Sequence, residues 1–229
     1  MLNERITPSS LEEIASEARR SYTTVEDMVC DALRKAIITG VFLPGRRLRQ
    51  DLIAETLGVS RMPVRSCLRK LEAEGLVVFY PHRGATVRTI SSSDVAEIYE
   101  LRTILESYAL EHVIGQITNE EIDEIEILAK KMDSEQDPMK WYEIRQLFYR
   151  QLYQIANRPR LSELIAKLRL EITAYLLTVR VTDDHSELIE YIRQRNKRAA
   201  TRWLEDHLKE ISEQLQNMVS EERFNNEST

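Results

Sequence analysis

The sequence has few of the residues that build disulfide frameworks or turn-rich β-folds. Its 229 residues include two cysteines, six glycines and six prolines. Cys30 and Cys67 are too few for a disulfide scaffold or a structural zinc site. So little glycine and proline argues against a sandwich or barrel with many tight turns. We therefore expect a mainly helical protein in a reducing compartment.

Long apolar runs are also missing. No stretch approaches the ~18 apolar residues that a transmembrane helix needs. The N-terminal residues lack the basic and apolar regions of a secretory signal. These two absences predict a cytoplasmic protein with no membrane partner. The length suits two domains, since domains typically run to ~100–200 residues.

Charge is distributed unevenly along the chain. Residues 22–90 carry 11 Lys and Arg against 7 Asp and Glu, whereas residues 91–229 carry 18 against 27. This asymmetry indicates a basic module that meets an anion, joined to an acidic body. Chance variation of a solvated surface would give the same pattern, so charge alone does not decide for nucleic acid.

The basic module reads as three helices followed by a hairpin. Apolar residues at helical spacing predict a first helix between a cap at Thr23 or Thr24 and Gly40. Further helices are predicted over 49–56 and 60–75. Two short β-type segments, 76–80 and 85–88, flank a turn at 81–84 and predict a β-hairpin. Together these elements make a winged helix-turn-helix.

The third helix of this module has one apolar face and one basic face. A helical wheel places four apolar residues on one side, namely Val64, Cys67, Leu68 and Leu71. The other side carries Met62, Arg65, Ser66 and Arg69. In a helix-turn-helix the second helix of the motif enters the major groove, where arginine pairs with guanine. Ordinary solvated arginines are the alternative interpretation.

Residues 43–50, 52–65 and 71–77 read Leu-Pro-Gly-Arg-Arg-Leu-Arg-Gln, Leu-Ile-Ala-Glu-Thr-Leu-Gly-Val-Ser-Arg-Met-Pro-Val-Arg and Leu-Glu-Ala-Glu-Gly-Leu-Val. They resemble the winged-helix domain of GntR-family transcriptional regulators. Residues 94–106 resemble the opening helix of the all-helical FCD-type effector domain of the FadR subfamily. The resemblance implies a homodimeric regulator, which we expect to be a repressor. Its affinity for a palindromic double-stranded operator would change with a small effector, often a carboxylate.

The resemblance also implies which residues contact DNA. By match to the family motif, Ser60, Arg61 and Arg65 would be DNA contacts, with Arg83 and Gly84 in the wing. We add four neighbours from the basic face and the preceding helix: Arg49, Met62, Ser66 and Arg69. Asp51 stands where some relatives carry a DNA-contacting arginine, so we do not include it.

The rest of the chain predicts an antiparallel helical bundle. Helices are expected over 92–115, 118–133, 138–156, 159–180, 184–195 and 197–220. The resulting domain plan is an extension over 1–21, a DNA-binding domain over 22–90, an effector-binding and dimerisation domain over 91–222, and a polar tail over 223–229. A short helix carrying Leu11, Ile14, Ala15 and Ala18 is an open possibility.

Two histidines bear on a metal site. His185 and His207 each lie 11 residues from Asn196, which places them at one height on adjacent antiparallel helices. The resemblance implies a divalent metal held by an Asp, a His four residues later and two further histidines. Arg145 and Tyr149 occupy the first two of these positions, so only His185 and His207 remain as candidate ligands. Zinc sites normally need at least three protein ligands, so we expect no cofactor and no bound Zn²⁺ or Ni²⁺.

An effector pocket is the alternative use of these positions. We assign to it Arg102, Arg145, Tyr149, His185 and His207. Arg145 would anchor a carboxylate through two parallel hydrogen bonds. Alternatively, Arg145 pairs internally with Glu106 or Glu143 and closes the cavity.

Two other functions compete with an effector-controlled regulator. One is an enzyme that uses His185, His207 and Tyr149. The chain has no nucleophile–base motif and no glycine-rich phosphate loop, so we expect no enzyme activity. The other is a constitutive DNA binder whose helical domain only dimerises.

Overall fold

The computed structural model describes residues 11, 14, 24–81, 84–179 and 184–227. The chain divides into two compact units, Met1–Thr89 and Ile90–Thr229. The first combines helices with a small antiparallel sheet, and the second is helical throughout its described residues. The expected mainly α-helical fold, with a winged helix-turn-helix followed by a helical bundle, is confirmed.

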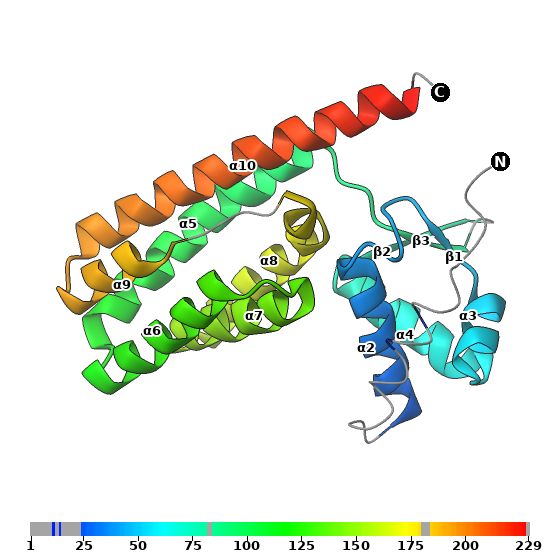
Figure 1. Ribbon diagram of the computed structural model, residues 1–229, viewed down its shortest axis with the longest axis horizontal. Helices are drawn as coiled ribbons and strands as arrows, with labels where there is room; N and C mark the ends of the chain where they lie inside the picture. Colours follow the sequence, from blue (N-terminus) through cyan, green and yellow to red (C-terminus); the bar gives the residue numbers. More distant parts are fainter. Residues whose placement is uncertain (1–10, 12–13, 15–23, 82–83, 180–183, 228–229) are drawn as a thin grey trace. The chain divides into compact units, whose positions relative to one another are not determined.

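From Thr24 onward, the described residues of the N-terminal unit form three helices and three strands (Figure 1). Its helices are α2 (Val25–Ile38), α3 (Gln50–Leu57) and α4 (Arg61–Ala73), and its strands are β1 (Arg47–Leu48), β2 (Val77–Tyr80) and β3 (Gly84–Val87). The strands pair antiparallel in the order β1-β3-β2. The hairpin β2–β3 was expected, but β1 was not. A strand of two residues is too short to show apolar–polar alternation in a sequence.

Local signals account for the ends of these helices. The Thr24 hydroxyl accepts the Asp27 backbone N–H at 3.1 Å and caps α2. Gly58 ends α3 in the left-handed conformation, with φ 63°. Ser60 has the extended backbone of an N-cap before α4, although its side chain makes no capping hydrogen bond. Within the extension, Leu11 is helical and fully buried and Ile14 is helical, while Ala15 and Ala18 lie outside the described residues.

The C-terminal unit contains α5 (Ser92–Gln116), α6 (Asn119–Ser134), α7 (Pro138–Gln154), α8 (Pro159–Val179), α9 (Ser186–Arg193) and α10 (Lys197–Glu227). The long helices α5 and α10 run side by side (Figure 1). Capping boxes begin α5 at Ser91 and α6 at Thr118. Helix α10 continues beyond residue 220, so the residues from Arg223 to Glu227, which we expected to form a tail, extend this helix.

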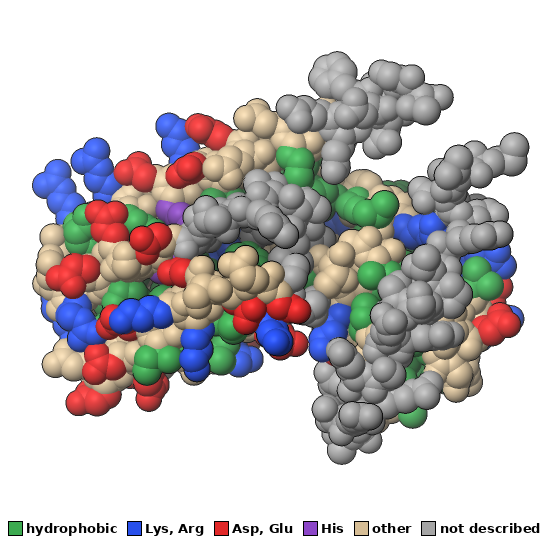
Figure 2. Space-filling model, viewed as in Figure 1, with side chains coloured by type: hydrophobic (Ala, Val, Ile, Leu, Met, Phe, Trp, Pro, Cys, Tyr) green, Lys and Arg blue, Asp and Glu red, His purple; other side chains and the backbone are tan. Residues whose placement is uncertain are grey.

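The surface of the C-terminal unit carries both signs of charge. Acidic and basic side chains are interspersed over the face that Figure 2 presents. Arg193, for example, donates to Asp123 at 2.8 Å and to Glu126 at 2.7 Å. None of the helices in the described ranges is both long enough and apolar enough to cross a membrane.

Candidate DNA-binding face and ligand cluster

The recognition helix α4 presents an exposed face near its N-terminus. Arg61, Met62 and Arg65 are exposed, with 77% of the Met62 surface accessible, and Ser60 just before the helix is exposed as well. The opposite side of α4 is buried in the core of the unit. The exposed end therefore has the residue types and the placement that reading a major groove requires.

Three of the other predicted DNA contacts are held by neighbours within the unit. The Arg69 guanidinium donates to Glu72 at 2.8 Å and lies 4.0 Å from the ring centroid of Phe79. Ser66, together with Lys70, hydrogen-bonds the Glu26 carboxylate and lowers its pKa, Lys70 having the larger effect. Arg49 donates to Asp51 at 3.0 Å. Exposed pairs of this kind are weak and exchangeable.

Of the two DNA contacts predicted in the wing, Gly84 lies among the described residues. Gly84 opens β3 opposite Tyr80, with φ 76°. No atom lies within 4 Å of the position that a Cβ would take, so backbone conformation and not lack of space favours glycine here. Arg83 lies outside the described residues.

Among the residues of the C-terminal unit whose side chains are described, three arginines and one glutamate are buried. Arg102, Arg145 and Arg169 are at most 3% exposed, and Glu106 is fully buried. Glu106 accepts from Arg102 at 2.8 Å through one oxygen and from Arg169 and Tyr153 through the other. Burial opposes the ionisation of Glu106, but the two arginines outweigh it and lower its pKa to about 2. We call Arg102, Glu106 and Arg169 the buried triad.

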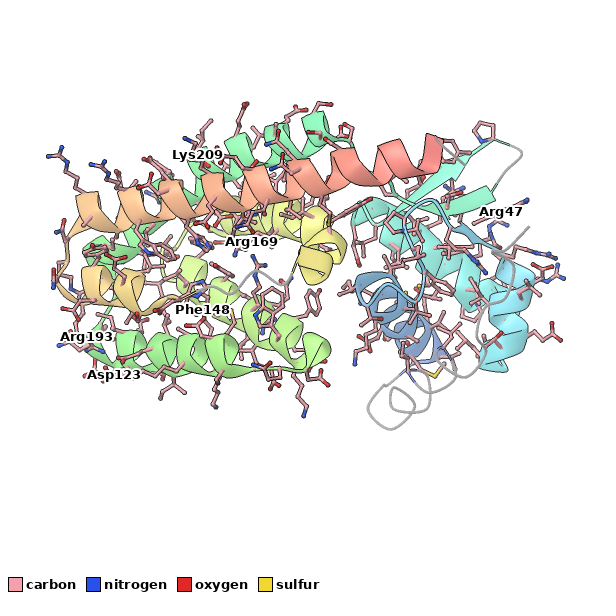
Figure 3. All side chains as sticks on the ribbon, turned by 45° about the horizontal axis from the view of Figure 1, so that its top comes forward. Arg47, Asp123, Phe148, Arg169, Arg193 and Lys209 are labelled. Atoms are coloured by element: carbon pink, nitrogen blue, oxygen red, sulfur yellow. The ribbon has the colours of Figure 1, made fainter. Side chains whose placement is uncertain are left out.

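The guanidinium groups of Arg145 and Arg169 pack against aromatic rings. The Arg145 carbon Cζ lies 5.0 Å from the Tyr149 ring centroid and 5.3 Å from that of Trp141. Arg169 approaches the same Tyr149 ring to 3.1 Å. Tyr149 is therefore in contact with two buried cations, an arrangement that cation–π attraction favours. Figure 3 shows Arg169 and Phe148 inside the bundle, whereas Arg193 and Asp123 lie at one end of it.

The His185 ring is held from both sides. Its Nδ1 lies 3.0 Å from an Asp133 oxygen, and its Nε2 lies 2.8 Å from the Tyr149 hydroxyl. Asp133 also accepts the His185 backbone N–H at 3.2 Å, just before α9 begins. With Nδ1–H donating to the carboxylate, Nε2 accepts from the tyrosine.

His207 completes the cluster from α10. Its ring centroid lies 5.7 Å from that of His185 and 4.7 Å from that of Trp203. Burial, with nearby His185 and Arg145, lowers the pKa of His207 to about 3, so this ring is neutral at physiological pH.

The structure thus gathers four of the five predicted effector residues, Arg145, Tyr149, His185 and His207, into what we call the histidine cluster. Arg102, the fifth, belongs to the adjacent buried triad. Sequence reasoning missed Asp133, Tyr153 and Arg169. Tyr153 follows Tyr149 by one helical turn, which is a usable signal, but nothing local marks the other two.

The donors in the histidine cluster do not fit a divalent metal. Both ring nitrogens of His185 already have partners, and a guanidinium stands at the first ligand position. Among the described residues, no three His, Cys, Asp or Glu side chains form a set that could hold a metal ion.

Family models match both units. The model for bacterial regulatory proteins of the gntR family matches residues 25–87, and the model for the FCD domain matches residues 97–210. The chain belongs to the GntR family of transcriptional regulators.

Relatives of this GntR-family regulator resemble it along most of their length. It is 27% identical over 205 residues to YdhC of Bacillus subtilis, an HTH-type transcriptional regulator, covering 84% of this chain and 92% of that one. It is 25% identical over 214 residues to the HTH-type transcriptional repressor RspR of Escherichia coli, covering 86% and 91%. The solved structure of E. coli McbR/YncC shares the fold, with a TM-score of 0.70 at 22% identity, covering 86% of this chain and 99% of that one. The GntR-family chain is a transcriptional regulator and not an enzyme.

The buried triad yields a prediction about stability. Glu106→Gln should cost about 3–5 kcal/mol, because it leaves two buried guanidinium groups without their carboxylate. In the wild type, the low pKa of Glu106 adds stability above its unfolded value of about 4.5, and this contribution is lost as pH falls toward 2. Urea unfolding at pH values from 7 to 3 should therefore show a smaller acid-induced loss of unfolding free energy in Glu106→Gln than in the wild type.

Exposed Glu111→Gln, on the same helix, is the matched control and should change the free energy of unfolding by less than about 0.5 kcal/mol. Equal stability of Glu106→Gln and the wild type would contradict the assignment of the buried triad.

Proposed function

We propose that this GntR-family regulator is a homodimeric repressor of a palindromic operator, and that a small carboxylate bound in its FCD domain changes its affinity for DNA. The observation that carries the ligand part is the buried triad of the C-terminal unit, in which two arginines share one glutamate. RspR, a relative of similar length, is named as a repressor, which supports repression here.

The DNA-reading part rests on the exposed end of α4. Arg61 and Arg65 lie one helical turn apart, so their side chains reach the same stretch of groove. Ser60 and the wing glycine, Gly84, suit contacts to phosphate. A homodimer presents two such helices about one DNA turn apart, which is why its operator would be palindromic.

The ligand part rests on the charge of the buried triad. The buried guanidinium groups of Arg102 and Arg169 share the single carboxylate of Glu106. Buried charge is costly unless it is paired. A carboxylate ligand supplies the missing anion, and guanidinium groups bind carboxylates with strong, directional hydrogen bonds.

We further propose that the FCD domain works without a metal. Arginine cannot lose its proton in proteins, so Arg145 repels a cation where a metal-binding relative would offer a carboxylate. The Tyr149 hydroxyl, hydrogen-bonded to His185, replaces a second ligand with a neutral group.

The dimer surface follows from exposed apolar residues on α5. Leu101, Ile104 and Tyr108 are 42%, 66% and 50% exposed, and their spacing places them on one face of the helix. That face lies opposite Arg102 and Glu106, which point into the bundle. Contiguous exposed apolar side chains mark interaction surfaces, so we propose this stripe as the dimer contact.

The first test addresses DNA reading. A fragment that the wild type selects from a random DNA pool serves as the operator. Arg65→Ala should weaken binding to it by ~1–3 kcal/mol, because a base-contacting arginine is lost. Fluorescence anisotropy measures this loss, and wild-type affinity should fall steeply with salt. Arg202→Ala, which removes a 79% exposed arginine from α10, is the charge-matched control. Undiminished binding by Arg65→Ala would reject the reading face.

The second test addresses the dimer. Ile104→Glu should shift the protein from dimer to monomer in light scattering, because it places a charge in an apolar contact. Ile127→Glu, at a position of α6 that is 54% exposed, should leave the dimer intact. If Ile104→Glu remains a dimer at micromolar concentration, the dimer contact is not the apolar stripe of α5.

The third test addresses the metal. Elemental analysis of protein purified without an affinity tag should find far less than one Zn²⁺ or Ni²⁺ per chain. A chelator should leave the melting temperature unchanged, because no folding energy comes from a metal. Stoichiometric metal that disappears in His185→Ala and His207→Ala would overturn this part of the proposal.

A further inference from the structure

A cavity of about 410 Å³ lies between α7 and α8, apart from the side of Tyr149 that binds His185. Tyr149 and Tyr153 line it from α7, and Ile165, Ala166 and Arg169 line it from α8. Its volume falls within the range of pockets that hold small organic ligands. The cavity runs from exposed residues at its rim to buried residues at its inner end.

The inner walls suit a flat apolar group. The rings of Tyr149 and Tyr153 are nearly parallel, at 17°, with centroids 6.1 Å apart. Ile165 is 1% exposed, whereas Ala166, which also lines the cavity, is exposed and belongs to its rim. Aromatic and aliphatic walls of this kind bind apolar bodies and leave orientation to a few polar groups.

Arg169 supplies the polar group at the inner end. It is 3% exposed, and its Nη1 donates to Glu106. Its Nη2 is also buried but has no hydrogen-bond partner among the described residues. A buried donor without an acceptor is destabilising. The buried triad carries two positive charges against one negative, so a bound anion would balance it.

The rim carries charge that favours anions. Arg150 and Arg158 line the pocket and are exposed, whereas Glu163 is the acidic residue of the lining. A positive rim raises the local concentration of anionic ligands and speeds their entry.

We propose that the α7–α8 pocket binds an aryl monocarboxylate, with its ring between the apolar walls and its carboxylate on the Nη2 side of Arg169. This inference rests on the carboxylate effector of the proposed function and gives it a place and a chemical class. The anchor is then Arg169 and not the Arg145 of the histidine cluster.

The test uses the full-length chain and two pairs of probes. Benzoate and phenylacetate are compared with benzamide and phenylacetamide by calorimetry. The amides keep size and shape but lose the charge. The acids should bind about tenfold to a hundredfold more tightly than the amides, the range that a hydrogen bond to a charged group supplies.

Two variants and one control variant locate the binding site. Ala166→Trp places a large ring at the rim of the pocket, away from the buried triad, and should abolish binding of the acids by blocking their entry. Leu164→Trp, at a position on α8 that is 53% exposed and outside the pocket, should bind as the wild type does. Arg169→Lys keeps the positive charge but removes the planar guanidinium, which can donate two parallel hydrogen bonds. It should weaken binding of the acids at least tenfold. If Arg169→Lys does not fold, Ala166→Trp decides.

Each outcome bears on a separate claim. Equal binding of acids and amides, no binding of any probe, or full binding by Ala166→Trp would overturn the pocket proposal. Acids that bind through the pocket but leave operator affinity unchanged would support the pocket. They would also overturn carboxylate control of DNA binding, in favour of a constitutive DNA binder. DNA binding without ligand, tested by Arg65→Ala, stands independently of all these results.

Discussion

The FCD domain of this chain depends on one fully buried carboxylate. Glu106 of α5 is bound by Arg102 of its own helix, by Tyr153 of α7 and by Arg169 of α8. Moving a carboxylate out of water costs several kcal/mol, which only good geometry and a full set of donors can offset. Helices α5, α7 and α8 therefore have to adopt one mutual arrangement for the domain to be stable. This requirement makes the triad a determinant of structure as well as a source of charge.

Helices α5 and α8 connect the proposed ligand pocket with the first residues of the C-terminal unit. Helix α8 carries Arg169 and, six residues later, Tyr175, whose hydroxyl accepts the backbone N–H of Ile90 at 3.1 Å. Helix α5 begins two residues after Ile90, at a capping box that fixes its first turn. A ligand that changes the contacts of Arg169 therefore acts on a helix that also holds the first residue of the FCD unit. An allosteric effect requires different contacts in two states, and the shared helix is a physical route for them.

Most of the fold followed from sequence, whereas the site followed only in part. The apolar periodicity of α2 and α4, the left-handed Gly58 and the caps at Thr24 and Ser91 are local features that a sequence displays directly. Strand β1 escaped prediction because its two residues depend on β3 for their pairing. The cluster of Arg145, Tyr149, His185 and His207 was accessible because the family motif aligns these positions. Asp133 and Arg169 were not, since their roles arise from contacts between helices more than 50 residues apart in sequence.

Arg145 and Tyr149 give the bundle a cation and a neutral hydroxyl at the two positions where the family resemblance implies metal ligands. Arg145 cannot be deprotonated, so its positive charge stays in the bundle where a metal-binding relative would place an anion. The Tyr149 hydroxyl hydrogen-bonds His185, and the face of its ring contacts Arg145 and Arg169. Aromatic rings and hydrogen bonds thus fill this part of the bundle, and positive charge lies on both Arg145 and Arg169 beside the Tyr149 ring. Within the described part of the chain, Arg169 has a buried donor, Nη2, without a hydrogen-bond partner and also lines the α7–α8 cavity. Electrostatics therefore favours the proposed anionic ligand there over a cation in the histidine cluster.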